Sequence, residues 1–147
     1  MDIRDFLTQQ EKDGILRAIR DAENRTSGEI RLHLENHCKA DVLNRAAVVF
    51  HKLDMDASAL RNGVLFYVAV KDHKFAILGD KGINDIVPPD FWDNIKEHML
   101  AHFKENRYAQ GITEGIGMAG EQLRKHFPVQ EDDVNELPDD ISYGGTT

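Results

Sequence analysis

Carboxylate, amide and cationic side chains flank two apolar runs in the middle of the chain. Arg61 and Asn62 precede the first run, Asp80 and Asp85 follow the second, and Glu29 opens an earlier alternating segment. Carboxylate and amide oxygens are the ligands that Ca²⁺ and Mg²⁺ prefer. Glu29, Asp80 and Asp85, with the amide of Asn62, are therefore a candidate cation site. In the alternative interpretation, Arg61 forms an ion pair with Glu29 or Asp80 that only closes the edge of the sheet.

A second candidate metal site consists of two histidines. His98 and His102 are four residues apart, so a helix places them on one face, where they could hold Zn²⁺ or Ni²⁺. The metalloprotease form H-E-x-x-H needs a glutamate after the first histidine, and Met99 stands there. The simpler interpretation is a position beside the core.

Two further segments match catalytic motifs in their amino-acid sequence alone. Residues 54–58 read D-x-D-x-S, like a phosphatase nucleophile loop, but that loop follows a buried strand and a helix is expected here. A solvated turn is the simpler interpretation, and Asp54 and Asp56 could alternatively be outer ligands of the cation site. His37 and Cys38 are adjacent, but adjacency in sequence is not an oriented catalytic pair.

The elements expected around these residues bring several of them together. The apolar runs 64–70 and 74–79 are separated by three polar residues and predict a hairpin, which places Arg61 and Asn62 beside Asp80. Residues 29–35 alternate between apolar and polar, which predicts a strand near the sheet edge with one face in water. A helix over 41–53 joins this strand to the next, so the two are expected to be parallel.

Helix signals complete the expected fold. Thr8 and Glu11 form a capping box for a helix reaching Asn24, Asp41 can cap the second helix, and Pro88 and Pro89 suit the start of the third. The fourth, from residue 108, contains four glycines, which predict close approach to the sheet or to another helix, with a frayed or broken helix as the alternative. The order α-β-α-β-β-α-α predicts an α/β/α sandwich: three layers, with a small mixed β-sheet flanked by helices.

Composition and charge distribution restrict the class of protein. The net charge is −8, and residues 128–147 contain six acidic residues without any Lys or Arg. We expect a domain over 1–127 and an acidic tail that is either disordered or docked in extended form through Val134, Leu137, Ile141 and Tyr143. No basic stripe predicts nucleic-acid binding, and no apolar run predicts a membrane span. A cytoplasmic location is expected because no secretory signal is recognisable, and the single cysteine excludes an intrachain disulfide.

Several segments resemble the TPM domain family, which includes thylakoid-lumen acid phosphatase-like and photosystem II repair proteins. Residues 61–70 resemble its "NNGVLLLVA" strand, 27–32 its first strand, and 79–84 its "GYGLE" turn. Phe103, Tyr108, Gly111 and Ile112 are similar to its late motif. The resemblance covers residues 9–127, but Asn84 stands where the family turn has a glutamate, and Asp80-Lys81 replaces its tyrosine with one extra residue.

The resemblance implies the same α/β/α fold, binding of Ca²⁺ or Mg²⁺, and acid phosphatase activity. We therefore expect a divalent-cation-binding domain with weak phosphatase activity, in which Glu29, Asp80 and Asp85 hold the metal and Arg61 or Lys81 steadies a phosphate. The alternative is a non-enzymatic adaptor or assembly factor that meets a protein partner through the acidic tail or the glycine-rich helix. Many family members are exported and tethered to membranes, and no tether is recognisable in this sequence.

Overall fold

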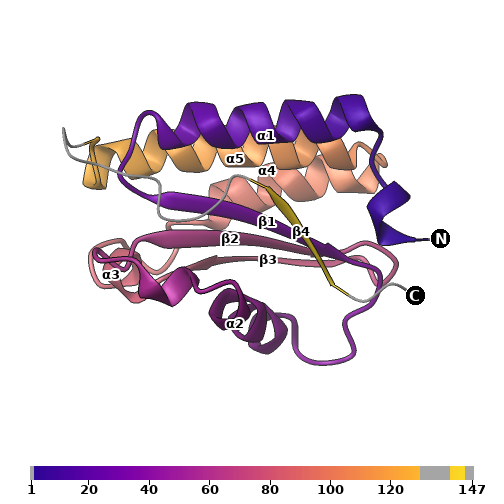
Figure 1. The fold of residues 1–147 in the computed structure, drawn as a ribbon, viewed down its shortest axis with the longest axis horizontal. Helices are drawn as coiled ribbons and strands as arrows, with labels where there is room; N and C mark the ends of the chain where they lie inside the picture. Colours follow the sequence, from indigo (N-terminus) through magenta and orange to yellow (C-terminus); the bar gives the residue numbers. More distant parts are fainter. Residues whose placement is uncertain (1, 130–139, 145–147) are drawn as a thin grey trace.

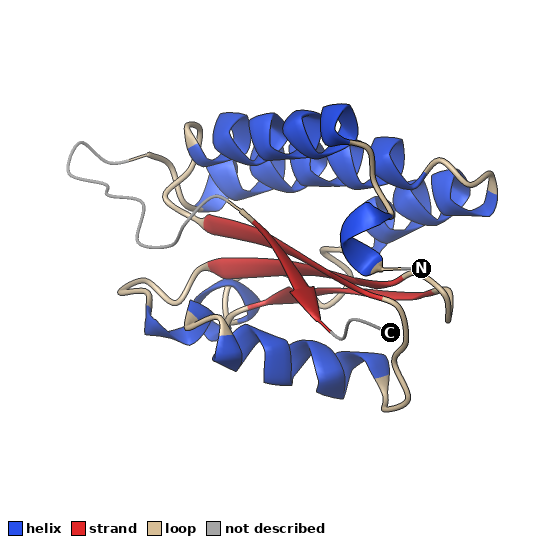
Figure 2. Ribbon diagram, turned by 45° about the vertical axis from the view of Figure 1, so that its right-hand side comes forward, coloured by secondary structure: helices blue, strands red, loops and turns tan. Residues whose placement is uncertain are grey.

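The structure is a computed structural model that describes residues 2–129 and 140–144. Its centre is a four-stranded sheet in the order β3-β2-β1-β4, with strands β1 (Glu29–Glu35), β2 (Gly63–Ala69), β3 (Lys74–Gly79) and β4 (Ile141–Gly144) (Figure 1). One face of this sheet is covered by three long helices, α1 (Gln9–Glu23), α4 (Asp93–Lys104) and α5 (Tyr108–His126), and the other by α2 (Val42–Lys52) (Figure 2). The predicted α/β/α sandwich is confirmed.

The pairing of the first three strands follows the prediction. β1 and β2 run parallel, with Glu29 opposite Gly63, and β2 and β3 form the antiparallel hairpin, with Val64 opposite Gly79. All seven residues of β2 are buried, as expected for an almost unbroken apolar run. The hairpin and the parallel crossover therefore bring the starts of β1 and β2 to the same end of the sheet as the end of β3.

Two predicted helix starts are confirmed by their capping hydrogen bonds. Thr8 Oγ1 accepts the N–H of Glu11 at 3.1 Å, and Glu11 Oε1 accepts the N–H of Thr8 at 2.8 Å, which is the reciprocal capping box of α1. Asp41 accepts the N–H of Asn44 at 3.2 Å at the start of α2. Short polar side chains thus fix where both helices begin.

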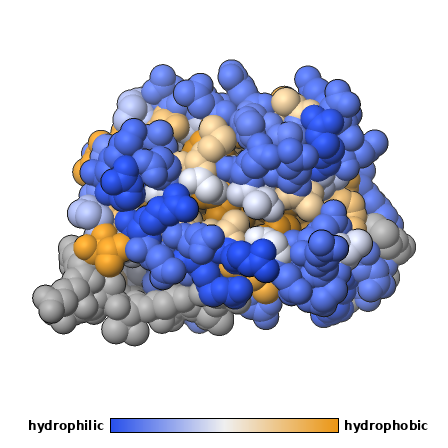
Figure 3. Space-filling model, turned by 90° about the horizontal axis from the view of Figure 1, so that it is seen from above, coloured by the Kyte–Doolittle hydropathy of each residue, from blue (hydrophilic) through white to orange (hydrophobic). Residues whose placement is uncertain are grey.

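The apolar side chains form a core on each side of the sheet. The larger core lies under the three long helices and contains, among others, Ile15, Ile19, Ile30, Leu32, Leu34, Phe66, Ile112 and Ile116. The smaller core lies under α2 and includes Val49, Phe50, Leu65, Tyr67 and Ala76. Seen from the side of the three long helices, the surface is mostly hydrophilic, with small apolar patches between the helices (Figure 3).

The exposure of β1 differs from the prediction. All seven of its residues are buried, including the polar side chains expected to face water. β4 pairs in parallel with β1, from Ile141 opposite Leu32 to Gly144 opposite Glu35, so β1 is an interior strand. The predicted wet face at a sheet edge is wrong, because a segment of the tail supplies the edge strand and α2 covers the second face.

The tail and the segment before α4 add two details. Ile141 and Tyr143 pack on the larger core in extended form, whereas Val134 and Leu137 lie outside the described residues. Residues 79–84, expected as a turn, include a short helix, α3 (Lys81–Asn84). The prolines at 88 and 89 do not begin the third helix directly, because α4 starts at Asp93 after a turn.

Three glycines of α5 allow the close helix packing that the sequence predicts. A Cβ on Gly111 would lie 2.9 Å from Phe103 Cε1, one on Gly115 2.6 Å from Met99 Sδ, and one on Gly120 2.6 Å from Ala22 Cβ. Both neighbours are helices, since Met99 and Phe103 belong to α4 and Ala22 to α1. Gly117 has no such contact.

Within the described part of the chain, none of the helices has both the length and the apolar character needed to cross a membrane.

Candidate metal centre

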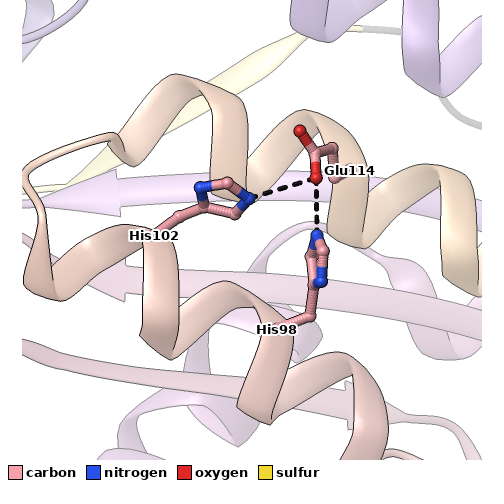
Figure 4. Close-up of side chains that lie close together, drawn as sticks. All are labelled: His98, His102 and Glu114. Carbon is pink, nitrogen blue, oxygen red and sulfur yellow. Dashed lines mark hydrogen bonds and ion pairs between the residues drawn. The ribbon is translucent and has the colours of Figure 1, made fainter.

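Two histidines of α4 and one glutamate of α5 converge on the outer side of the helix layer. Glu114 Oε1 lies 2.5 Å from His98 Nε2 and 3.1 Å from His102 Nε2 (Figure 4). Among residues 2–129 and 140–144, this is the one group of three or more His, Cys, Asp or Glu side chains whose ligand atoms all lie within 4.8 Å of one another. The histidines are those singled out in the sequence, and the structure adds the third ligand.

The local fold explains why these side chains meet. His98 and His102 lie one turn apart on α4 and share a face. The joint at 105–107 reverses the chain, and Asn106 takes a left-handed conformation there (φ 61°). α5 then packs closely against α4 at Gly111 and Gly115, which places Glu114 opposite the histidines.

Hydrogen bonds to Glu114 favour its ionised form. The imidazole of His98, the amide of Gln110 and the imidazole of His102 lower the pKa of Glu114 from 4.5 to about 2. Gln110 Nε2 donates to Oε2 at 2.8 Å, which orients the carboxylate so that Oε1 faces the histidines. The glutamate is therefore an anion at neutral pH, as a metal ligand must be.

Arg107 fixes the proton of His102. Its Nε–H donates to His102 Nδ1 at 3.1 Å. A guanidinium is a donor only, so Nδ1 accepts, and His102 carries its proton on Nε2 and donates it to Glu114. A metal on Nε2 would require the proton on Nδ1 and Arg107 turned away, and the Arg107 side chain is 49% exposed.

A groove of about 780 Å³ adjoins this cluster. His98 and Glu114 form part of its wall, and Arg25 and Asp90 approach from the loops after α1 and before α4. His98 and Glu114 have side chains 40% and 39% exposed, whereas His102 is only 12% exposed. A ligand in the groove would therefore reach the two more exposed members of the cluster.

The residues of the first sequence-based site lie at the end of the sheet where β1 and β2 begin and β3 ends, which is called the sheet edge below. Arg61 Nε and Nη2 donate to the two oxygens of Asp80 at 2.9 and 3.0 Å, and the N–H of Lys81 donates to Asp80 Oδ1 at 2.7 Å. The buried Asn62 donates to Ser27 Oγ at 3.3 Å. The ion pair between Arg61 and Asp80, one of the two interpretations of this edge, is therefore formed.

The three carboxylates predicted to hold a cation take different positions. Glu29 is buried at the start of β1, Asp80 caps α3, and Asp85 is exposed where α3 ends. They do not form a group of ligand atoms within 4.8 Å of one another. A cation at this edge would have to displace Arg61 from Asp80.

The two other motifs have structural roles. Residues 54–58 form a turn with a 3-10 helix (Met55–Ala57) after α2, in which Asp56 pairs with the exposed His51 at 2.8 Å. Cys38 is buried, and its neighbour His37 pairs with Asp72 at 2.9 Å. Residues 54–58 thus form the predicted turn, in which Asp54 and Ala57 are exposed but Met55 and Ser58 are buried.

A buried polar cluster escaped the sequence analysis. Glu35 accepts hydrogen bonds from Arg45 at 2.8 and 2.9 Å, from His33 Nε2 at 3.1 Å and from the hydroxyl of Tyr67. Burial alone would raise the pKa of Glu35, but the hydrogen bonds from Arg45, His33 and Tyr67 hold it well below its ordinary value. Ser142 of β4 completes the cluster through a 2.8 Å hydrogen bond to His33 Nδ1.

Comparison with known families decides where the chain belongs. The model of the TPM domain matches residues 1–122. The chain belongs to the TPM domain family. The matched part contains the sheet edge and the His98, His102 and Glu114 cluster of this TPM domain, but ends before β4.

Solved structures agree with this TPM assignment. The NMR structure of BA42 from the psychrophilic bacterium Bizionia argentinensis is 53% identical, covers 97% of this chain and 98% of its own, and superposes with a TM-score of 0.91. The solution structure of the N-terminal domain of a P. gingivalis protein is 20% identical over 86% of this chain and 83% of its own, with a TM-score of 0.64, and shows the same fold. None of the curated proteins matches this TPM domain.

Proposed function

We propose that this TPM domain binds a divalent transition metal, Zn²⁺ before others, through His98, His102 and Glu114. The observation that carries the proposal is the convergence of three ligand atoms from two packed helices within 4.8 Å. Two imidazoles and one carboxylate are a known zinc ligand set, and three protein ligands leave a fourth position open.

The distances in the cluster suit this metal. At zinc–ligand bonds of about 2.0–2.2 Å, tetrahedral ligand atoms stand about 3.3 Å apart. The present separations from Glu114 Oε1 are 2.5 and 3.1 Å, so these two distances need to widen by less than about 1 Å. Imidazole nitrogen also favours Zn²⁺ over Ca²⁺ and Mg²⁺, which prefer oxygen.

The experiment is a calorimetric titration of Zn²⁺ into the metal-free protein and three variants. We expect one bound ion per chain, and loss of binding in His98→Ala and Glu114→Gln. His51→Ala is the matched control, because His51 also pairs with a carboxylate at 2.8 Å but belongs to no three-ligand group among the described residues. Equal binding in all four proteins, or none at micromolar Zn²⁺, would refute the proposal.

Thermal unfolding gives an independent readout. Free Zn²⁺ at one hundred times its dissociation constant stabilises the bound form by about 2.7 kcal/mol. For a chain of 147 residues this corresponds to a rise in melting temperature of about 5–10 °C. The same Zn²⁺ should leave the melting temperature of His98→Ala unchanged.

Binding of Ca²⁺ or Mg²⁺ by Glu29, Asp80 and Asp85 is a separate proposal, supported by the oxygen ligands at the sheet edge and by the family resemblance. It requires Asp80 to exchange Arg61 for the cation. Titration of both ions into the protein and into Asp80→Ala tests it. Saturable binding that is lost in the variant would support a site at this edge, and absence of binding at millimolar ion would refute it.

Phosphatase activity is the catalytic form of the proposal. A zinc ion with an open position can polarise a phosphoryl oxygen, and Arg25 lines the same groove, where its charge would suit a phosphate ester. Hydrolysis of p-nitrophenyl phosphate that depends on Zn²⁺ and falls in Arg25→Ala would support it. Zinc binding without hydrolysis would leave a metal-binding adaptor as the function.

A further inference from the structure

A separate apolar pocket of about 310 Å³ lies where the β2–β3 hairpin meets the corner between α4 and α5. Its apolar wall includes Val68, Phe75, Leu100, Phe103 and Tyr108. This volume is at the small end of the range for ligand pockets, which bind mainly through apolar walls and a few polar groups. The pocket shares no lining residue with the groove beside His98.

Aromatic contacts hold the wall of this pocket in place. Phe103 packs edge-on against Phe75 with ring centroids 5.0 Å apart and stacks on Tyr108 at 4.8 Å. Tyr108 in turn meets Phe6 edge-on at 5.3 Å. Rings that support one another in this way leave the pocket preformed, so a ligand would not have to order it. Leu100, which is 41% exposed, stands at the mouth.

The rim of the pocket is basic in a protein whose net charge is −8. Among the described residues, the basic ones that line it are His73, Lys74 and Lys104, and none of the residues that line it is acidic. The ammonium of Lys74 donates to the carbonyl of Cys38 at 3.0 Å on the α2 side of the sheet, so Lys104 is the rim lysine available to an anion. The groove beside His98 is lined instead by the carboxylates of Asp90, Glu114 and Glu121, together with Arg25 and His98.

We propose that this pocket binds a small amphipathic carboxylate, with its hydrocarbon part against Phe103 and Leu100 and its carboxylate at Lys104. The apolar wall selects a hydrocarbon chain or ring, because burial of such surface drives binding. The basic rim selects a single anionic end group over a neutral or cationic one. The ligand class is therefore a medium-chain or aromatic carboxylic acid.

Sodium octanoate is the probe for the full-length protein, with binding followed by calorimetry and by amide chemical shifts. We expect saturable binding, with perturbed resonances in β3 and in the last turn of α4. Each methylene removed should weaken binding about fourfold, so hexanoate binds less tightly. Octylamine has the same chain with the opposite charge and should bind at least about tenfold more weakly.

Variants locate the site without disturbing the core. Leu100→Asp puts a carboxylate at the mouth and Lys104→Glu reverses a rim charge, and each should weaken octanoate binding on the order of tenfold. Leu43→Asp and Lys52→Glu are matched controls on α2, where Leu43 is 49% exposed and Lys52 is exposed. These controls should bind octanoate like the unchanged protein.

Three outcomes would overturn the proposal: no octanoate binding at millimolar concentration, equal binding of octylamine, or equal loss in the matched controls. The last experiment tests binding to vesicles of phosphatidylcholine in which about one lipid in five is oleate. Binding to these vesicles without binding of free octanoate would make the patch a membrane contact and would also overturn the small-ligand proposal.

Discussion

Replacing Glu35 with glutamine tests how much the buried polar cluster stabilises the fold. The carboxylate accepts hydrogen bonds from Arg45, His33 and Tyr67, and its side chain is only 4% exposed. Removing one partner of a buried ion pair costs about 3–5 kcal/mol, because the other charge stays buried. Arg45 is 28% exposed and regains some hydration, so we expect a loss of about 2–4 kcal/mol.

Urea unfolding followed by circular dichroism measures this loss. With a slope of about 2 kcal/mol per molar urea, the midpoint should fall by about 1–2 M. Glu121→Gln is the matched control, since it breaks an ion pair with Arg124 in which the side chains are 44% and 51% exposed. The control should lose less than about 1 kcal/mol. A Glu35→Gln loss no larger than that of the control would refute the reasoning.

The acid dependence of stability provides a second readout of Glu35. Its pKa in the folded protein lies below the ordinary value of 4.5, so the folded state binds fewer protons than the unfolded state as the pH approaches that value. The stabilisation is therefore fully present above about pH 4.5 and is lost progressively as the pH falls below it. Glu35→Gln should make the decline in unfolding free energy shallower below pH 4.5, and an unchanged slope would contradict this assignment.

Three further changes test separate contacts. Arg107→Ala removes the donor that holds His102 in the wrong tautomer for zinc on Nε2, so calorimetry should show about fivefold tighter Zn²⁺ binding, whereas weaker binding would exclude this role. Gly82→Ala places a Cβ 2.2 Å from the carbonyl oxygen of Leu60 and should lower the unfolding free energy by about 2 kcal/mol or more, while a neutral effect in urea would disprove the tight contact. Gly117→Ala has no neighbour within 4 Å and should raise the unfolding free energy by roughly 0.5–1 kcal/mol, and a fall in melting temperature would show an unrecognised contact.

Local signals predicted most of the elements from the sequence. The capping box at Thr8 and Glu11 and the cap at Asp41 depend on hydrogen bonds between residues three apart, which a sequence displays directly. The hairpin of β2 and β3 follows from two apolar runs and a short joint. The pairing of Arg61 with Asp80 follows from that hairpin, because the two ends must meet.

The missed features depend on contacts between distant segments. Glu114 becomes the third ligand only through the register of α5 on α4, which the glycines at 111 and 115 set by allowing close approach. The paired spacing of His98 and His102 was visible in the sequence, but no local pattern indicated their acidic partner. Counting turns on both sides of the joint at 105–107 would have placed Glu114 near them, because the two helices are antiparallel.

The polar face of β1 was misassigned for the same reason. Alternation in residues 29–35 normally indicates one wet face, yet here Glu35 and His33 are buried beneath α2 and β4. The residue that completes their hydrogen bonding, Ser142, is 109 positions further along the chain. An alternating strand can therefore be fully buried when its polar residues satisfy one another.

The late arrival of β4 has a consequence for biosynthesis. β1, β2 and β3 can pair as soon as residue 79 has emerged from the ribosome, but the outer edge of β1 stays open until Ile141 to Gly144 have been translated. Long-range pairings of this kind form slowly, and an unpaired strand edge promotes aggregation. The nascent domain thus exposes an unpaired, aggregation-prone strand edge while more than sixty codons are translated. Ribosome stalling within that interval should increase the demand for chaperones.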